Sequence, residues 1–112
     1  MTIFEKIAAR QIPAQFVHET DEFFVIRDVN PQAPVHVLIV PKRVIPRIGE
    51  ASAEDAVLLA RMLLAAPEIA KKVGVDETGY RLVLNNGRDA GESVPHLHIH
   101  LLGGRSLQWP PG

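Results

Sequence analysis

Three histidines alternate with aliphatic residues near the end of the 112-residue chain, in the segment His96-Leu97-His98-Ile99-His100. Successive side chains of a strand point to opposite faces, so this spacing places the three imidazoles on one face, about 6.6 Å apart along the backbone. Each imidazole carries two ring nitrogens that need hydrogen-bond partners, and packing alone explains such a row poorly. The pattern therefore indicates chemistry.

Two kinds of chemistry fit the histidine row. Alternate histidines on a strand can share a zinc ion. The chain has no cysteine, and residues 103–106 just after the row offer no carboxylate as a further ligand. The other possibility is nucleophilic attack by one imidazole, whose free nitrogen is selected by a hydrogen bond at the other nitrogen.

The polar segment before the row, residues 85–93, favours the nucleophilic interpretation. Gly91 permits close approach of the backbone to a ligand. The side-chain amide of Asn85, and both the hydroxyl and the backbone N–H of Ser93, are donors that suit phosphate oxygens. The composition of this segment alone suits an ordinary hairpin loop better. Neither G-x-x-x-x-G-K-[ST] nor G-x-G-x-x-G occurs in the chain, so neither common nucleotide-binding loop is present.

Three further residues have both an ordinary and a functional interpretation. Asp28 follows an apolar strand, where it is either a turn residue or an acceptor for ribose hydroxyls. His36 interrupts the most apolar segment of the chain and needs a polar partner, either structural or catalytic. Trp109 near the end indicates a docked tail that covers either its own core or a partner.

The elements that must position these residues follow from hydrophobic periodicity and turn residues. We predict a short helix over residues 3–10 and strands over residues 15–19, 22–28, 35–40, 80–84 and 96–102. The third strand is apolar at all positions but one, which is typical of a central strand buried on both faces. Several strands with one long helix between them predict an α+β domain, with a mainly antiparallel five-stranded sheet, over residues 1–112.

The long helix opens with a capping box of Ser52 and Asp55 and ends at Gly74. Pro67 is expected to kink or divide it. Its buried face is predicted from apolar residues at helical spacing, namely Leu59, Leu63, Ala66, Ile69 and Val73.

Composition excludes several classes of protein. The chain is 46% hydrophobic with a formal net charge of -1, which argues against disorder and against binding of a nucleic acid polymer. No apolar run is long enough to span a membrane, and the first residues do not look like a secretory signal, so we expect a cytoplasmic protein. A chain this small has little surface to enclose a substrate alone, which favours a homodimer.

These segments together resemble the histidine triad (HIT) family, in its nucleotide-binding Hint branch. The triad HLHIHLL is accompanied, along nearly the whole chain, by TIFEKIAARQIPA, RDVNPQAPVHVLIVPK, GYRLVLNNGRDAGESV, GGR and WPPG. The resemblance implies a HIT-like fold, no cofactor, no metal, and a homodimer whose two sheets join. It also implies a purine nucleoside phosphoramidate hydrolase that releases a nucleoside monophosphate such as AMP.

The resemblance also assigns roles to residues. It makes His98 the nucleophile that forms a nucleotidyl-histidine intermediate, while His100 and Ser93 contact the phosphate and His96 and His36 orient His98. It places Asp28 on the ribose, and Asn85, Gly91 and Glu92 beside the phosphate. Ile3, Phe4, Ile7, Ile26 and Val29 surround the base, and Trp109 reaches toward the partner's site.

The sequence departs from the common family pattern at Val44, Pro67 and Pro95, which bears on substrate preference and local geometry. Two alternative functions stay open. One is a non-catalytic nucleotide-binding or regulatory module, and the other is a dinucleoside polyphosphate hydrolase.

Overall fold

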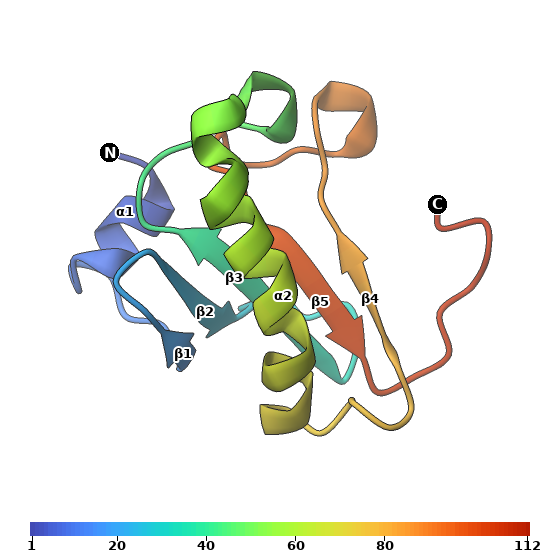
Figure 1. Cartoon of the computed structure of the whole chain (residues 1–112). Coiled ribbons are helices and arrows are strands. Elements are labelled where there is room, and N and C mark those ends of the chain that lie inside the picture. Colours follow the sequence, from blue (N-terminus) through green and yellow to red (C-terminus); the bar gives the residue numbers. More distant parts are fainter.

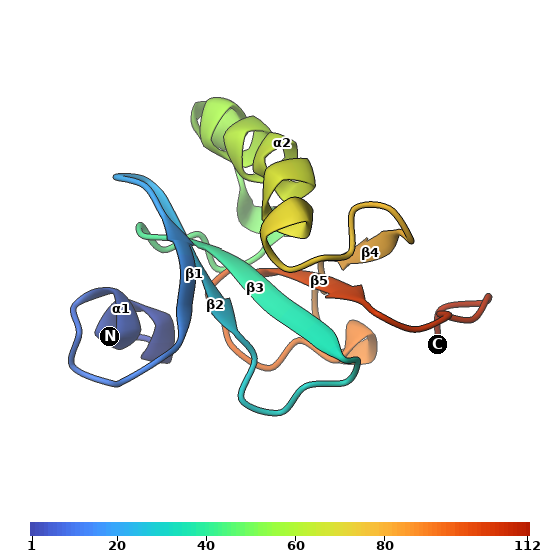
Figure 2. The ribbon, with the colours of Figure 1, turned by 90° about the horizontal axis from the view of Figure 1, so that it is seen from below.

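A five-stranded antiparallel sheet separates two helices, which confirms the predicted α+β fold (Figures 1 and 2). The computed structural model describes residues 1–112, and the strands lie in the order β1-β2-β3-β5-β4. The elements are α1 (Ile3–Ala8), β1 (Phe16–Glu19), β2 (Phe23–Arg27), β3 (Val35–Pro41), α2 (Ala56–Lys72), β4 (Tyr80–Val83) and β5 (Ile99–Gly103). Neither helix has the length and apolar character needed to cross a membrane.

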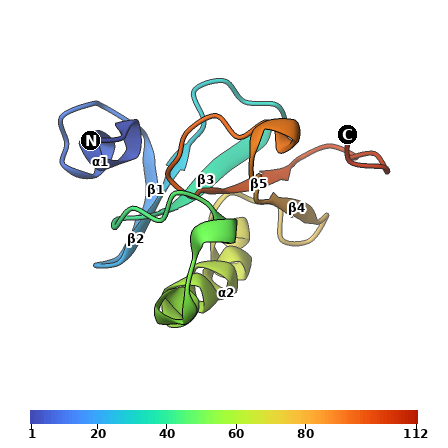
Figure 3. The ribbon, with the colours of Figure 1, turned by 90° about the horizontal axis from the view of Figure 1, so that it is seen from above.

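β3 is the central strand and contributes to both hydrophobic cores, as its sequence predicts. Val37 and Ile39 belong to the larger core under α2, whereas Leu38 and Val40 belong to the smaller core under α1. α1 and α2 therefore cover opposite faces of the sheet, as Figures 2 and 3 show. Apolar residues on both faces explain why β3 lacks the alternation of a half-exposed strand.

The buried face of α2 differs from the predicted one. The residues that pack onto the sheet are Leu58, Met62, Ala66, Ile69 and Ala70. Ala66 and Ile69 were predicted correctly, and the predicted Leu59 and Val73 pack against the same core while partly buried. Leu63 was predicted wrongly, because 49% of it is exposed. The helix carries more apolar residues than one face can hold, so periodicity alone does not select the face.

The prediction that Pro67 divides the long helix is wrong, because α2 is one continuous helix from Ala56 to Lys72. Pro67 lies on the exposed side, and the carbonyl it leaves without an N–H donor, that of Leu63, belongs to a half-exposed residue. Buried neighbours of Pro67 hold that turn against the sheet. Gly74 ends the helix with a positive φ of 78°, as predicted.

The last strand begins at Ile99 and not at His96, so only His100 of the three histidines lies within β5. Pairing with β3 stops at Ile39↔Ile99, because continuing it would require an N–H from Pro41 that proline does not have. Leu97 instead donates its N–H to the carbonyl of Ile45 at 2.7 Å. The alternation of side chains nevertheless continues, with Leu97 in the α2 core.

The packing of α2 predicts different costs for two neighbouring truncations. Met62 is fully buried, so Met62→Ala should lower the free energy of unfolding by ~2–5 kcal/mol. Leu63→Ala should cost no more than ~0.5 kcal/mol, since that side chain is half exposed. Urea denaturation of both variants measures the difference. Equal losses would show that α2 presents another face to the sheet.

Candidate active site

Four of the five histidines meet on the α1 side of the sheet. The ring of His100 lies 5.0 Å from that of His98 and 5.1 Å from that of His36, between centroids. Phe4 of α1 contacts the other end of this row, with its ring 5.0 Å from His98 and 5.4 Å from His96. β3 and the segment that runs into β5 therefore bring four imidazoles into one cluster, which α1 contacts through Phe4.

His96 is fully buried, and both of its ring nitrogens have partners. Nε2 lies 2.7 Å from the carbonyl oxygen of Pro41, which can only accept, so Nε2 carries the proton. Nδ1 is then the acceptor for the hydroxyl of Thr2 at 2.7 Å. Thr2 is also the N-cap of α1, in a capping box with Glu5. The start of the chain is thereby joined to the first histidine of the triad.

The tautomer of His98 is fixed by a backbone group. Its Nδ1 lies 2.8 Å from the carbonyl oxygen of His96, so Nδ1 donates and the lone pair of the neutral ring is on Nε2. Nε2 has no hydrogen-bond partner within the chain. Since no buried side-chain nitrogen or oxygen lacks a partner, Nε2 reaches solvent. His98 therefore presents an unprotonated ring nitrogen to the outside while only 8% of the residue is exposed.

His36 and His100 form a second fixed pair. Gln32 donates its backbone N–H to Nδ1 of His36 at 3.0 Å, so Nε2 of His36 carries the proton. That nitrogen lies 2.9 Å from Nδ1 of His100 and 3.4 Å from a carboxylate oxygen of Asp28. His100 then holds its own proton on Nε2, which has no partner within the chain and can donate to a ligand.

Burial keeps three of the imidazoles neutral. Desolvation lowers the pKa of His96, and it lowers the pKa of His36 against the opposing charge of Asp28. It also lowers the pKa of His100 to about 4, with further contributions from His98 and His36. At neutral pH these rings therefore act as hydrogen-bond donors and acceptors without charge.

Asp28, His36 and His100 are the one set of side chains grouped as metal ligands are, with ligand atoms within 4.8 Å of one another. Metal binding requires an unprotonated nitrogen on each histidine. Nδ1 of His36 is occupied by the N–H of Gln32, which leaves the proton on the nitrogen that faces the group. This donor set therefore fits a hydrogen-bonded relay, and an ion would have to displace the Gln32 contact.

The loop before β5 contributes groups that are free within the chain. Neither the side-chain amide of Asn85 nor the hydroxyl and N–H of Ser93 has an internal partner. The backbone amides of Gly91 and Glu92, in contrast, donate to the carbonyls of Arg88 and Gly87. Of the residues predicted beside a phosphate, Asn85 and Ser93 are the available donors.

The predicted base-binding residues fall into two groups. Phe4, Ile7 and Ile26 are buried together in the α1 core, whereas Ile3 and Val29 are 47% and 96% exposed. Of these five residues only Val29 lines a cavity of about 540 Å³, whose other lining residues are Pro13, Ala14, Gln15, Arg27 and Asp28. The cavity is adjacent to the histidine cluster through the contact between Asp28 and His36.

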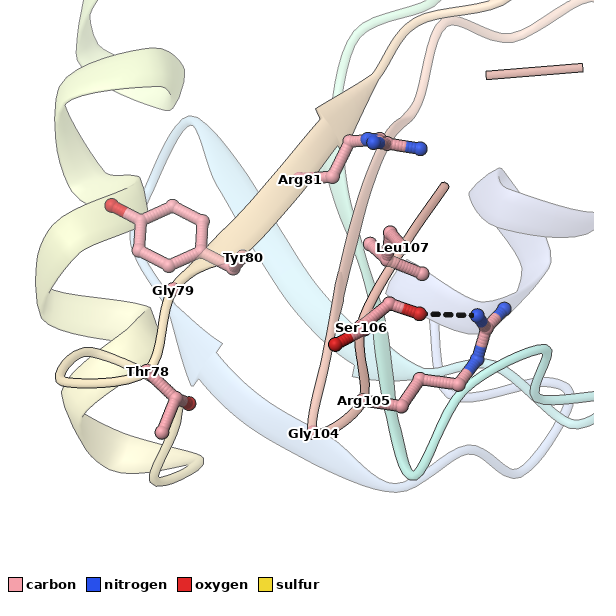
Figure 4. Close-up of a pocket in the computed structure, with 8 residues that line it drawn as sticks. All are labelled: Thr78, Gly79, Tyr80, Arg81, Gly104, Arg105, Ser106 and Leu107. Carbon is pink, nitrogen blue, oxygen red and sulfur yellow. Dashed lines mark hydrogen bonds between the residues drawn. The ribbon is translucent and has the colours of Figure 1, made fainter. Parts of the chain in front are cut away.

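Trp109 does not cover the chain's own core, because 82% of it is exposed. Its tail is attached by Arg81, which donates to the carbonyl of Gln108 at 2.9 Å. A second cavity of about 540 Å³ lies between the tail and β4, and no histidine lines it (Figure 4). Its lining residues are Thr78, Gly79, Tyr80, Arg81, Gly104, Arg105, Ser106 and Leu107.

Sequence reasoning missed the groups that fix the tautomers. Thr2 could have been found, since Thr2 and Glu5 have the spacing of a capping box. The N–H of Gln32 and the carbonyl of Pro41 could not, because any residue type supplies a backbone group. Arg47, which pairs with Glu92, also carried no signal in the sequence.

Comparison with known proteins agrees with this geometry. The HIT domain family matches residues 9–107. The chain belongs to the HIT family. A purine nucleoside phosphoramidase of Escherichia coli K12 is 47% identical over 106 residues, which are 95% of this chain and 89% of that protein. An uncharacterised HIT-like protein of Synechocystis is 51% identical over 99% of this chain and 96% of its own length.

Solved structures lead to the same family. A HIT family hydrolase from Legionella pneumophila has a TM-score of 0.96 and 46% identity, with complete coverage of both chains. A histidine triad nucleotide-binding protein from Candida albicans has a TM-score of 0.83 and 30% identity, covering 98% of this chain and 83% of that one. These relatives support hydrolase activity for this HIT protein.

The buried contact of Thr2 predicts a specific loss. Thr2→Val should lower the free energy of unfolding by ~1–3 kcal/mol, because Nδ1 of His96 would be left buried without a donor. Thr2→Ser keeps the hydroxyl and is the matched control, while Glu5→Ala removes the capping box alone. Urea denaturation gives the energies, and ¹⁵N NMR of the imidazoles reports the tautomer of His96. An unchanged His96 signal in Thr2→Val would contradict the assignment.

Proposed function

We propose that this HIT protein hydrolyses purine nucleoside phosphoramidates and releases a nucleoside monophosphate such as AMP. The observation that carries the proposal is the state of His98, whose Nδ1 proton is committed to the His96 carbonyl while Nε2 is free and accessible. A neutral imidazole in this state can attack phosphorus without first losing a proton. The phosphoramidase of Escherichia coli, at 47% identity, supports the substrate class.

The proposed reaction has two steps. Nε2 of His98 attacks phosphorus, the P–N bond breaks, and its electron pair leaves on the amine nitrogen, which takes up a proton. A water molecule then attacks the nucleotidyl-histidine, the new P–N bond breaks, and its electron pair returns to Nε2. The proton lost by the water replaces the one that the amine took up, so the two steps together leave the enzyme unchanged. The covalent intermediate divides one displacement into two. His100 through Nε2–H and Ser93 through its hydroxyl are the donors for the phosphate oxygens and the leaving nitrogen.

The remaining site residues are proposed to hold the nucleoside. Asp28 would accept the ribose hydroxyls, because its carboxylate lines the adjoining cavity while still close to His36. Asn85 would donate to the phosphate. The base would lie among Ile3, Phe4, Ile7, Ile26 and Val29, where the two exposed members, Ile3 and Val29, offer apolar contact surface. Gly91 and Glu92 would shape the loop, since their amides are already bonded.

Removal of the nucleophile is the direct test. His98→Ala should lower the turnover of an adenosine phosphoramidate by at least about 10³-fold, because no other ring offers an accessible unprotonated nitrogen. Purified variant and wild-type protein are compared by product release, and AMP binding to each is measured by calorimetry. A wild-type sample quenched in acid-free denaturant should show the added mass of the nucleotide on His98.

Four results would contradict the proposal or point to another class of function. Equal turnover by His98→Ala and wild type would remove the nucleophile assignment. Loss of wild-type turnover with a chelator would indicate metal chemistry at Asp28, His36 and His100. Faster turnover of a diadenosine polyphosphate than of the phosphoramidate would identify the substrate as a phosphoanhydride. Binding of AMP with turnover of neither compound would indicate a binding module.

We further propose that the protein is a homodimer. β4 is an edge strand, and unpaired edges are a natural place for a second sheet to join. Apolar side chains of α2, β4 and the C-terminal tail are exposed. The exposed fractions are 61% for Val57 and 77% for Leu64 in α2, 36% for Leu82 in β4 and 82% for Trp109 in the tail. Burial against a second copy would remove this surface from water.

The dimer is tested by mass in solution. Light scattering coupled to gel filtration should give twice the chain mass at micromolar concentration. Leu64→Glu should shift the mass toward one chain, because it places a charge on the exposed apolar surface of α2. Lys6→Glu changes charge on α1, across the sheet, and should leave the mass unchanged. A single-chain mass for the wild type would refute the dimer.

A further inference from the structure

The loop that carries Asn85 and Ser93 contacts the hydrophobic cores only at its two ends. None of the residues from 84 to 95 is fully buried, and only Leu84 and Val94, which are partly buried, pack against the cores, one on each face of the sheet. Yet the free donors of both residues must be held in place if they are to meet a phosphate. The position of residues 85–93, between these two ends, therefore depends on polar contacts.

Two such contacts join the loop to the segment that follows β3. Arg47 forms a forked pair with Glu92, from Nε to Oε1 at 2.8 Å and from Nη2 to Oε2 at 3.0 Å. The N–H of Gly49 donates to the side-chain oxygen of Asn86 at 2.7 Å. In Figure 1 these two segments, green and orange, lie side by side at one end of the sheet.

The segment that carries Arg47 is itself fixed. Ile45 is only 3% exposed and belongs to the α2 core. Its carbonyl also accepts the N–H of Leu97 at 2.7 Å, next to the first two triad histidines. Arg47 is thus two residues from the buried Ile45, whereas Glu92 is two residues from Val94, which is only partly buried. The ion pair therefore attaches the middle of the loop to a segment that the α2 core holds in place.

The carboxylate of Glu92 joins several points of the loop. Besides Arg47, its Oε1 accepts the N–H of Gly87 at 3.0 Å, and the N–H of Glu92 returns to the carbonyl of Gly87 at 3.1 Å. Arg47 first, and Gly87 next, lower the pKa of Glu92 to about 2, so the carboxylate stays charged across the working range of pH. Ser93 is the next residue in the chain.

We propose that Arg47 is a positioning residue of the active site, whose forked ion pair with Glu92 holds Ser93 and Asn85 against the phosphate of the substrate. The inference rests on the proposed function for the identity of the ligand. Arg47 touches no reacting atom and acts through Glu92. The planar guanidinium is suited to this, because it offers two parallel donors to one carboxylate, which a lysine cannot do.

The test separates the phosphate from the nucleoside. Arg47→Met should weaken AMP binding about three- to tenfold, as expected for loss of a partly shielded ion pair that orders a loop, and leave adenosine binding unchanged. Arg47→Lys should fall between Arg47→Met and wild type. Arg43→Met is the matched control, because Arg43 lies on the same segment but pairs with Asp55. Calorimetry measures both ligands, and turnover of an adenosine phosphoramidate should fall in parallel with AMP affinity.

A measurement without ligand tests whether the ion pair of Arg47 and Glu92 holds the loop in place. Hydrogen exchange at the amides of Gly87, Gly91 and Glu92 should be about tenfold faster in Arg47→Met than in wild type, since the loop opens more often. The double variant Arg47→Met with Glu92→Gln should be no weaker for AMP than Arg47→Met alone, because one contact is removed in both.

Each outcome decides one of the two claims. Unchanged exchange in Arg47→Met, or an equal loss of AMP and adenosine affinity, overturns the positioning role. Faster exchange in Arg47→Met, together with a wild type that binds neither AMP nor adenosine, supports the positioning role of Arg47 and refutes the proposed function. Faster exchange with a selective loss of AMP affinity supports both.

Discussion

One backbone carbonyl, that of His96, decides which nitrogen of His98 carries a proton. The contact between this oxygen and Nδ1 leaves the lone pair on Nε2, and the use of His98 as a nucleophile follows from that choice. The carbonyl can do this only if His96 stays in place. Its ring is held at one nitrogen by Pro41 and at the other by Thr2, so two distant parts of the chain converge on a single bond.

Hydrogen bonds orient the other imidazoles of the row in the same way. The N–H of Gln32 orients His36, and His36 in turn donates its Nε2–H in a hydrogen bond to Nδ1 of His100. Burial lowers the pKa of both rings, so neither carries a charge that would repel a protonated neighbour or compete for the phosphate. The sheet makes this possible by having a packed core on each face, with β3 contributing to both. The row of imidazoles thus lies in apolar surroundings, and each of its buried nitrogen atoms still has a hydrogen-bond partner.

Much of this could be predicted from the residues themselves, and the failures have physical causes. Alternation in the histidine segment correctly placed Leu97 and the imidazoles on opposite faces, because side-chain direction is a local property. The true start of β5 was missed, because it depends on a proline in the neighbouring strand. Leu63 was assigned to the core because α2 has more apolar residues than one face holds. The pair of Arg47 and Glu92 spans 45 positions, and no local pattern could have indicated it.

Residues 85–93, in the loop after β4, contribute no side chain to either core, and only their neighbours Leu84 and Val94 pack against the cores. In evolutionary terms this segment is separated from the selection that maintains folding, since a substitution there leaves the packed interior intact. Mutations at positions of this segment other than Asn85, Glu92 and Ser93 can therefore accumulate and alter preference among leaving amines, while the imidazoles, which are tied to the cores, stay constant. A lineage that explores new substrates would be expected to diversify here first, at little cost to its thermodynamic stability.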